Sequence, residues 1–166
     1  MPPTLSNPRD LFLQLLGELL WVERTLSFEV LPKLQGEIES EALASAVAEH
    51  LEQTKEHATR LEQVFRAVDA EPSSNLNSPV EKLAQHHDEL SESFVDNRLA
   101  DVFHAAAAAA TEHHEIASYD AILTLGQSVG LSAEARELLE RNRGEEGEAL
   151  ERLEAELQRL AGDLRE

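Results

Sequence analysis

The stretch ATEHHEIASY, residues 110–119, places four ionisable side chains in a row directly after an alanine run at residues 105–110. These side chains are Glu112, His113, His114 and Glu115. Carboxylates and imidazoles are the side chains that bind iron, manganese and zinc where no thiolate is available. Neighbouring residues of a helix point about 100° apart, so the four side chains cannot all face one partner. The stretch is therefore either part of a metal site or the solvated side of an ordinary helix.

Further carboxylates and histidines interrupt apolar stripes that have helical periodicity. Glu23 lies on the stripe formed by positions 12, 16, 19, 23, 26 and 30, and Glu146 lies on the stripe formed by positions 139, 143, 146, 150, 153, 157 and 160. His50 and His57 lie on the stripe formed by positions 47, 50, 54, 57, 61, 64 and 68. A carboxylate on a core stripe is costly unless it is paired or bound to a cation. These positions, all near the middle of a helix, therefore predict a cluster of polar groups inside a bundle.

In the fourth predicted helix, positions 102, 106, 109, 113, 116 and 120 follow the helical repeat and are taken as the side that faces the core. On this phase His113 faces the core and Glu112 flanks it. Glu115 projects to the opposite side from His113, and His114 lies at the rim. We therefore expect Glu112 and His113 to carry the chemistry of this stretch.

Four-helix bundles hold di-iron and di-manganese sites with glutamates from two helices and a Glu-x-x-His pair from each of the other two. Glu23 and Glu146 fit the first part of this pattern. The chain contains no Glu-x-x-His, and Gln53 stands where a carboxylate would serve. For each histidine alone, a hydrogen-bonded core or rim position is the simpler interpretation. Glu145 is expected on the solvated face, and Glu23 alone fits a buried ion pair as well as a metal.

The elements that must position these residues are all helical, because Ala, Leu, Glu and Gln dominate and glycine and proline are scarce. The first helix begins at the Asn7 cap and ends where Pro32 breaks the pattern, and Ser40 caps the second. A loop over residues 70–79 precedes a short third helix. Ser78 is its expected cap, Pro79 is its first residue, and Glu81 completes a capping box. Its inward-facing residues are Val80, Leu83, Leu90 and Phe94. The fourth helix runs from about residue 99 to 129 and stops at Gly130. Ser132 caps the fifth helix. We predict an all-α, up-and-down four-helix bundle with an additional short helix, formed as one domain by residues 1–166.

Composition limits the partners. The chain has 14 basic and 33 acidic residues and a net charge of −19, which repels nucleic acid and anionic membranes and attracts cations. It has no cysteine, which excludes disulfides and thiolate chemistry. The N-terminal MPPTLSNPRD is not typical of a signal peptide, and no apolar run approaches a membrane span. We expect a soluble, cytoplasmic protein. No phosphate-binding loop or nucleophile motif is recognisable, so whether the protein is an enzyme stays open.

Three segments resemble the YciE/YciF-like family of ferritin-like bacterial stress proteins, a group catalogued as a domain of unknown function. They are LFLQLLGELLWVERTL with LPKL, HLEQTKEHATRLEQVF, and EHHEIASY, where the family usually has tyrosine in place of His114. The resemblance implies a rubrerythrin-like bundle, usually dimeric, with a di-metal centre. It points to the following ligands: Glu23, His50, Glu112, Glu115 and Glu146. The family often has glutamate where this chain has Gln53.

Three hypotheses follow from the sequence. The first is a ferritin-like protein that binds iron or manganese through Glu23, His50, His57, Glu112, Glu115 and Glu146 and handles metal or oxidant during stress. The second is a non-enzymatic stress or scaffold protein that keeps the bundle and has lost the centre, which Gln53 motivates. The third is a pH-responsive homodimer in which buried His50, His57 and His113 become charged near pH 6.

Overall fold

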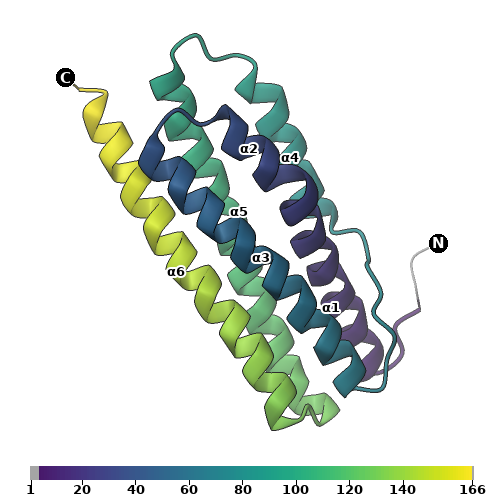
Figure 1. Ribbon diagram of the computed structural model, residues 1–166. Helices are drawn as coiled ribbons and strands as arrows, with labels where there is room; N and C mark the ends of the chain where they lie inside the picture. Colours follow the sequence, from purple (N-terminus) through teal and green to yellow (C-terminus); the bar gives the residue numbers. More distant parts are fainter. Residues whose placement is uncertain (1–3, 166) are drawn as a thin grey trace.

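The computed structural model describes residues 4–165 and shows a bundle of helices (Figure 1). The helices are α1 (Pro8–Thr25), a π-helical turn (Leu26–Val30), α2 (Leu31–Glu37), α3 (Glu41–Ala67), α4 (Ser78–Ser91), α5 (Asn97–Gly126), a 3-10 turn (Gln127–Val129) and α6 (Ala133–Asp163). Among the described residues there is no strand, and no helix has the length and apolarity needed to cross a bilayer. The predicted all-α bundle is confirmed. Residues 1–3 and 166 of the predicted single domain lie outside the described residues.

Most of the predicted caps are present. The side chains of Asn7, Ser40 and Ser132 each accept a hydrogen bond from the backbone N–H three residues later, which satisfies a donor that the first turn leaves free. Gly130 has a φ of 68°, the left-handed conformation that ends a helix and favours glycine. These local signals therefore set where the long helices begin and end.

The helix does not end at Pro32, and that prediction is wrong. The backbone N–H of Leu31 donates to the carbonyl of Leu26, five residues back, and α2 continues to Glu37. Proline has no N–H and its ring crowds the preceding turn. The widened π turn directly before Pro32 lets the chain continue through it without a break. As a result α1 and α2 form one rod whose helical phase changes at the π turn, Leu26–Val30.

The start of α4 also differs from the prediction. Asn77, rather than Ser78, is the capping residue, and its side chain accepts from the N–H of Val80 at 3.1 Å. Val80 is the one buried residue of α4 within the described chain, whereas Leu83 and Leu90 are 36% and 37% exposed. Phe94 lies beyond the end of the helix. The short helix is therefore attached to the bundle by a narrow contact.

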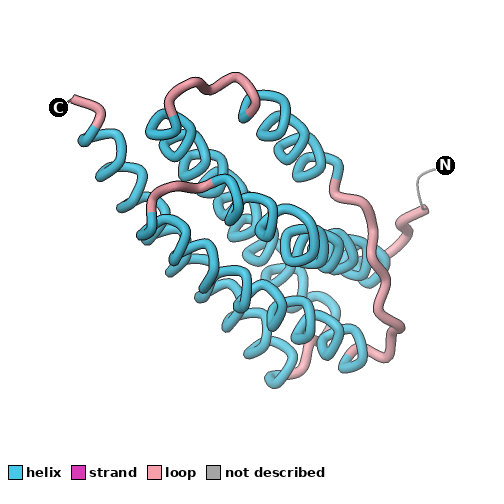
Figure 2. The backbone as a smooth tube through the Cα atoms, turned by 45° about the horizontal axis from the view of Figure 1, so that its top comes forward, coloured by secondary structure: helices cyan, strands magenta, loops and turns pink. Residues whose placement is uncertain are grey.

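The connection between α3 and α5 is a crossover. It consists of the loop at residues 68–77, which runs along the outside of the bundle beside α1, and of α4, which packs on α5 (Figures 1 and 2). The loop is held against α1 by the backbone N–H of Asn75, which donates to the carbonyl of Gly17 at 2.9 Å. Because the crossover returns the chain to the end where α3 began, α3 and α5 run in the same direction. One such long connection is the ferritin-like arrangement of a four-helix bundle.

The apolar core is divided into two clusters, one near each end of the bundle. One cluster joins the start of α1 to the ends of α3 and α5 and the start of α6 through residues such as Phe12, Phe65, Ile122 and Leu139. The other joins the π turn, the starts of α3 and α5 and the end of α6 through residues such as Leu26, Val47, Ala105 and Leu153. The four long helices are thus packed firmly on both sides of a middle layer, and that layer is polar.

Candidate metal centre

The polar layer contains all six side chains predicted as metal ligands. One or two come from each long helix, and their residues are at most 4% exposed: Glu23 on α1, His50 and His57 on α3, Glu112 and Glu115 on α5, and Glu146 on α6. His50 and His57 are seven residues apart, two turns of helix, so they face the same direction at different heights. Glu112 and Glu115 are three apart and share a face of α5. The absent Glu-x-x-His pattern is therefore replaced by a different distribution of the same side-chain types.

The six side chains form two adjacent groups that share Glu146. In one group, oxygen atoms of Glu23 and Glu146 and a nitrogen of His57 all lie within 4.8 Å of one another. In the other, ligand atoms of His50, Glu112, Glu115 and Glu146 meet the same condition. Both groups consist of carboxylates and imidazoles, the side-chain types with which helical bundles hold metal ions.

The hydrogen bonding of these side chains tests whether they fit a metal. Among the described residues, the buried side-chain oxygen and nitrogen atoms that have no hydrogen-bond partner belong to these six residues and to Gln53. His57 Nδ1 and Glu146 Oε1, which lie 2.8 Å apart, are two of these atoms. Buried polar atoms are almost always satisfied in folded proteins. Lone pairs that converge without satisfying one another are the donor set that a cation requires, so the residues fit a metal.

The orientation of His57 is set by Glu145 on α6. His57 Nε2 lies 2.9 Å from Glu145 Oε2, which also accepts from Arg60 Nη1 at 2.7 Å. Burial alone would raise the pKa of Glu145, but hydrogen bonds from Arg60, Arg141 and His57 lower it to about 2. The ionised carboxylate can only accept, so Nε2 of His57 carries a proton, and Nδ1 is the ring nitrogen that faces Glu23 and Glu146. A carboxylate behind a ligating histidine is a common support for metal binding.

Glu23 is supported by a hydrogen-bond chain that starts on α6. The hydroxyl of Tyr119 donates to Glu23 Oε1, and the side chain of Asn142 donates to the Tyr119 oxygen at 2.9 Å. Asn142 also donates to the backbone carbonyl of His57 at 3.2 Å and accepts from Arg60 at 2.9 Å. These contacts leave Glu23 Oε2 directed at the shared cluster, 3.5 Å from His57 Nδ1.

The second group is held less tightly. His50 Nε2 lies 3.0 Å from Glu112 Oε1 and 3.7 Å from Glu146 Oε2. The hydroxyl of Thr54 donates to the backbone carbonyl of His50 at 2.9 Å and also lies 3.4 Å from its Nε2. Gln53 follows His50 by three residues on α3, and its side-chain oxygen is buried without a partner. Gln53 therefore offers a neutral oxygen beside the second group.

Burial determines the protonation of the centre. It raises the pKa of Glu112 and of Glu146 to about 7, raises that of Glu115 well above its usual value, and lowers that of His50. Burial would also lower the pKa of His57, but the carboxylates of Glu23 and Glu146 outweigh it and raise this pKa to about 11. Without a cation, the layer must therefore take up protons to reduce its negative charge.

The predicted phase of the fourth helix is wrong by one position. His113 is exposed, with 63% of its side chain in solvent, and it lies 3.2 Å from Glu154 on the surface of α6. Glu115 is fully buried in the centre instead of projecting outward. The alanine run at residues 105–110 has no contrast between polar and apolar positions. Too few residues of this helix were therefore left to show which of its sides faces the core. The motif EHHEIASY, which carried the family resemblance, pointed to Glu115, and the structure buries this residue in the polar layer.

Three supporting residues were missed or misplaced by the sequence analysis. Glu145 was expected on the solvated face, yet only 19% of its side chain is exposed. Asn142 was missed because the stripe of α6 was read through the neighbouring position 143. Tyr119 closes the motif EHHEIASY, and its place one turn after Glu115 was an available signal. Their roles depend on contacts between helices, which periodicity does not report.

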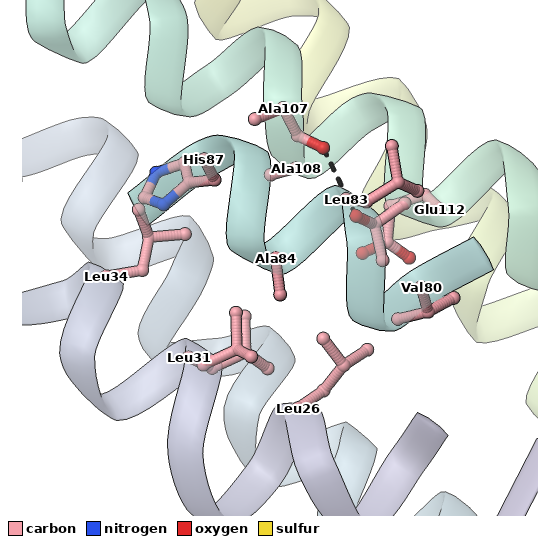
Figure 3. Close-up of a pocket in the computed structure, with 12 residues that line it drawn as sticks. Leu26, Leu31, Leu34, Val80, Leu83, Ala84, His87, Ala107, Ala108 and Glu112 are labelled. Carbon is pink, nitrogen blue, oxygen red and sulfur yellow. Dashed lines mark hydrogen bonds between the residues drawn. The ribbon is translucent and has the colours of Figure 1, made fainter. Parts of the chain in front are cut away.

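A small apolar cavity reaches the centre from the side of α4 (Figure 3). Its volume is about 40 Å³, room for a few water-sized molecules. Leu26, Leu31, Val80 and Ala108 are among the residues that line it, Glu112 lies at one end and His87 lies at the other (Figure 3). The cavity connects the second ligand group to the region under the short helix.

Comparisons with known proteins agree with this fold. The family model described as "Domain of unknown function (DUF892)" matches residues 7–163. Protein YciF of Escherichia coli (strain K12) is 34% identical over 137 residues, which cover 79% of this chain and 79% of the relative. The crystal structure of the E. coli stress protein YciF has a TM-score of 0.89 at 28% identity, covering 95% of this chain and 99% of the other. The structure of YcfI from Rhodopseudomonas palustris has a TM-score of 0.88 at 27% identity, covering 93% and 97%.

The match of the family model extends over both core clusters and all six side chains of the polar layer. The relative of known sequence shares more than a third of the aligned residues, and the solved structures share the whole arrangement of helices. The chain therefore belongs to the YciF-like family of helical bundles described as DUF892.

Proposed function

We propose that the protein binds two transition-metal ions, iron or manganese, in the polar layer of the bundle. Glu23 and His57 hold one ion, His50, Glu112 and Glu115 hold the other, and Glu146 contributes to both. Imidazole nitrogens and carboxylate oxygens suit these metals, and the chain has no cysteine that would favour a softer one. The proposal makes the protein a ferritin-like metal-handling member of its family.

The observation that carries the proposal is the set of unpartnered lone pairs between two firmly packed cores. Ionised Glu23, Glu112, Glu115 and Glu146 with neutral imidazoles carry four negative charges, which equal the positive charge of two divalent cations. The nearest buried arginine, Arg60, is already engaged by Glu145 and Asn142. Unpaired buried charge is strongly unfavourable, so bound cations are the simplest source of stability for this layer.

Iron or manganese bound here would supply electron exchange with small oxidants such as dioxygen or peroxide. The contribution of the protein is to hold Glu23 through Tyr119, to hold His57 through Glu145, and to exclude bulk water by burial of the whole layer. The narrow apolar cavity at Glu112 admits only small molecules. These properties and the stress-protein relative support a role in handling metal or oxidant under stress.

The alternative of a scaffold protein that has lost its centre is not favoured. It was motivated by Gln53, but Gln53 lies beside a complete set of buried ligand side chains rather than in place of one. A bundle without a metal would be expected to replace Glu112 and Glu115 with apolar residues, because buried carboxylates without partners are destabilising. The homodimer and the cytoplasmic location expected from the sequence remain predictions.

The test is metal analysis of protein purified without a histidine tag. The protein is stripped with chelator, loaded with Fe²⁺ or Mn²⁺ without oxygen, and passed through a desalting column. We expect about two ions per chain. Glu146→Gln removes the shared ligand and is expected to lower the content of both ions. Glu148→Gln, an exposed glutamate on the same helix, is the matched control and should bind as the unaltered chain does.

Thermal unfolding gives a second readout. Ligands that bind only the folded state raise the melting temperature, so iron or manganese should raise it and chelator should reverse the effect. Glu146→Gln should lose most of this response while Glu148→Gln keeps it. The proposal would be refuted if neither metal changed the melting temperature and the metal content were no higher than that of the buffer.

A further inference from the structure

A second group of metal-ligating side chains lies away from the bundle centre, where α2, α4 and α5 meet. Glu37 is the last residue of α2, His87 is on α4 and His104 is on α5. One ligand atom from each lies within 4.8 Å of the other two. His87 Nε2 and His104 Nδ1 are 2.9 Å apart. None of these residues belongs to the centre described above.

The fold brings the three residues together through contacts that do not involve their own ligand atoms. The carboxylate of Asp101, one turn before His104, accepts from the backbone N–H groups of Glu39 and Ser40 at 3.1 and 2.8 Å. This ties the segment after α2 to the start of α5, and so holds Glu37 near His104. Lys33 on α2 pairs with Asp88 on α4 at 2.7 Å, which brings the helix of His87 to the same place.

The ring of His87 has a defined orientation. It stacks on the ring of Phe103, with centroids 5.4 Å apart and an angle of 10° between the planes. Its Nδ1 faces Asp88 Oδ1 at 3.5 Å, so a proton on Nδ1 is stabilised and the lone pair of Nε2 is directed at His104. A carboxylate on one ring nitrogen and an open lone pair on the other is how ligating histidines are commonly held.

His104 is only 3% exposed. Two ring nitrogens 2.9 Å apart repel through their lone pairs unless a proton or a cation lies between them. The side chain of Glu37 is 32% exposed, so an ion can reach the group from solvent.

We propose that Glu37, His87 and His104 bind one Zn²⁺ ion at the junction of α2, α4 and α5. Two imidazoles and one carboxylate are a zinc ligand set, and three protein ligands leave a fourth position for water. The site goes beyond the proposed function, because none of its residues contributes to the central layer.

The ion fastens a helix that is otherwise weakly held. Val80 is the one buried residue of α4 in the described chain, so the helix has little apolar contact of its own. His87 also lines the cavity that ends at Glu112 (Figure 3). Zinc bound by His87 and His104 joins α4 to α5 and fixes the wall of that cavity.

The experiment compares two neighbouring histidines of α4. Untagged His87→Gln and His86→Gln variants are titrated with Zn²⁺ against a chromophoric chelator. His86 is exposed and also contacts Phe103, so its substitution controls for the loss of a surface imidazole beside that ring. We expect His87→Gln to bind one zinc ion per chain fewer than His86→Gln. Equal zinc binding by the two variants would overturn the proposal.

Hydrogen exchange of residues 78–91 provides a measurement that does not depend on counting ions. Zinc is expected to slow exchange in the unaltered chain and in His86→Gln, and to have no such effect in His87→Gln. Zinc-induced protection of His87→Gln equal to that of His86→Gln would also count against the site.

The outcome is separable from that of the central site. Iron or manganese content should be unchanged in His87→Gln, whereas Glu146→Gln should lose iron and manganese and keep the zinc effect on α4. Failure of one prediction therefore leaves the other standing.

Discussion

His57 Nε2 donates to Glu145 Oε2 at 2.9 Å, and this contact decides which ring nitrogen of His57 faces the centre. The carboxylate belongs to α6 and the imidazole to α3, so the orientation depends on the packing of two helices. Nδ1 is thereby left 2.8 Å from Glu146 and 3.5 Å from Glu23. The properties of the centre should therefore respond to residues that do not touch a metal.

The first prediction concerns Glu145→Gln. The amide keeps the size of the side chain but can donate a hydrogen bond to His57, which permits the ring to carry its proton on Nδ1. We expect the affinity for Fe²⁺ or Mn²⁺ to fall by about 10- to 100-fold, the usual effect of losing such a support. Competition titration measures it, and circular dichroism checks that the helices are intact. Glu148→Gln is the control, and an affinity equal to that of the control would show that Glu145 has no such role.

The second prediction concerns the stability of the metal-free protein as a function of pH. Burial raises the pKa of Glu112 and Glu146 from 4.5 to about 7, so the folded chain keeps protons that the unfolded chain releases. The stabilising effect is complete below pH 4.5 and is lost as the pH rises through 7. We expect the melting temperature in chelator to fall from pH 5 to pH 8.

Metal should reverse this trend, because it binds the ionised carboxylates and its affinity rises as they lose their protons. Calorimetry with and without Mn²⁺ provides the comparison. Glu112→Gln should have a flatter profile without metal, since it removes one of the titrating groups. A metal-free melting temperature that rises between pH 5 and pH 8 would be incompatible with buried carboxylates in this state.

The third prediction concerns Gln53→Glu. The Gln53 oxygen is buried without a partner, and Gln53 lies about one turn from His50 on α3. A carboxylate here adds a negative charge beside the second ligand group, and metal affinity increases with the charge of the ligands, so we expect about tenfold tighter binding. The melting temperature in chelator should decrease, because the added charge has no partner. Gln63→Glu, exposed on the same helix, should change neither quantity; an equal effect of both variants would mean that only net charge matters.

The fourth prediction concerns the crossover. A Cβ atom at Gly17 would collide with the side-chain amide of Asn75, whose backbone N–H donates to the Gly17 carbonyl. Gly17→Ala is therefore expected to lower the free energy of unfolding by about 1–3 kcal/mol. A Cβ at Gly144, inside α6, meets no atom within 4 Å, so Gly144→Ala should raise stability by about 0.5–1 kcal/mol. Chemical denaturation of both variants tests the pair, and stabilisation by both would show that the loop does not need this glycine.

Much of the fold and part of the site follow from the sequence. The caps at Asn7, Ser40 and Ser132 and the stop at Gly130 are local, because each depends on a few neighbouring residues and the hydrogen bonds of one helix end. The places of four polar residues on apolar stripes indicated a buried cluster: Glu23, His50, His57 and Glu146. A polar residue on such a stripe is destabilising unless it has a hydrogen-bonding partner or binds a cation.

Other features were decided only by the tertiary structure. The alanine run before Glu112 carries no contrast between its faces, so only packing against α6 determined that Glu115 is buried and His113 exposed. Likewise the helix continues through the π turn before Pro32, and this packs Leu31 and Leu34 into the core. The helix-breaking tendency of proline is a local property and does not include the stabilisation from this burial. The contacts of Glu145 with His57, and of His87 with His104, join helices far apart in the chain, and no periodicity within one helix contains them.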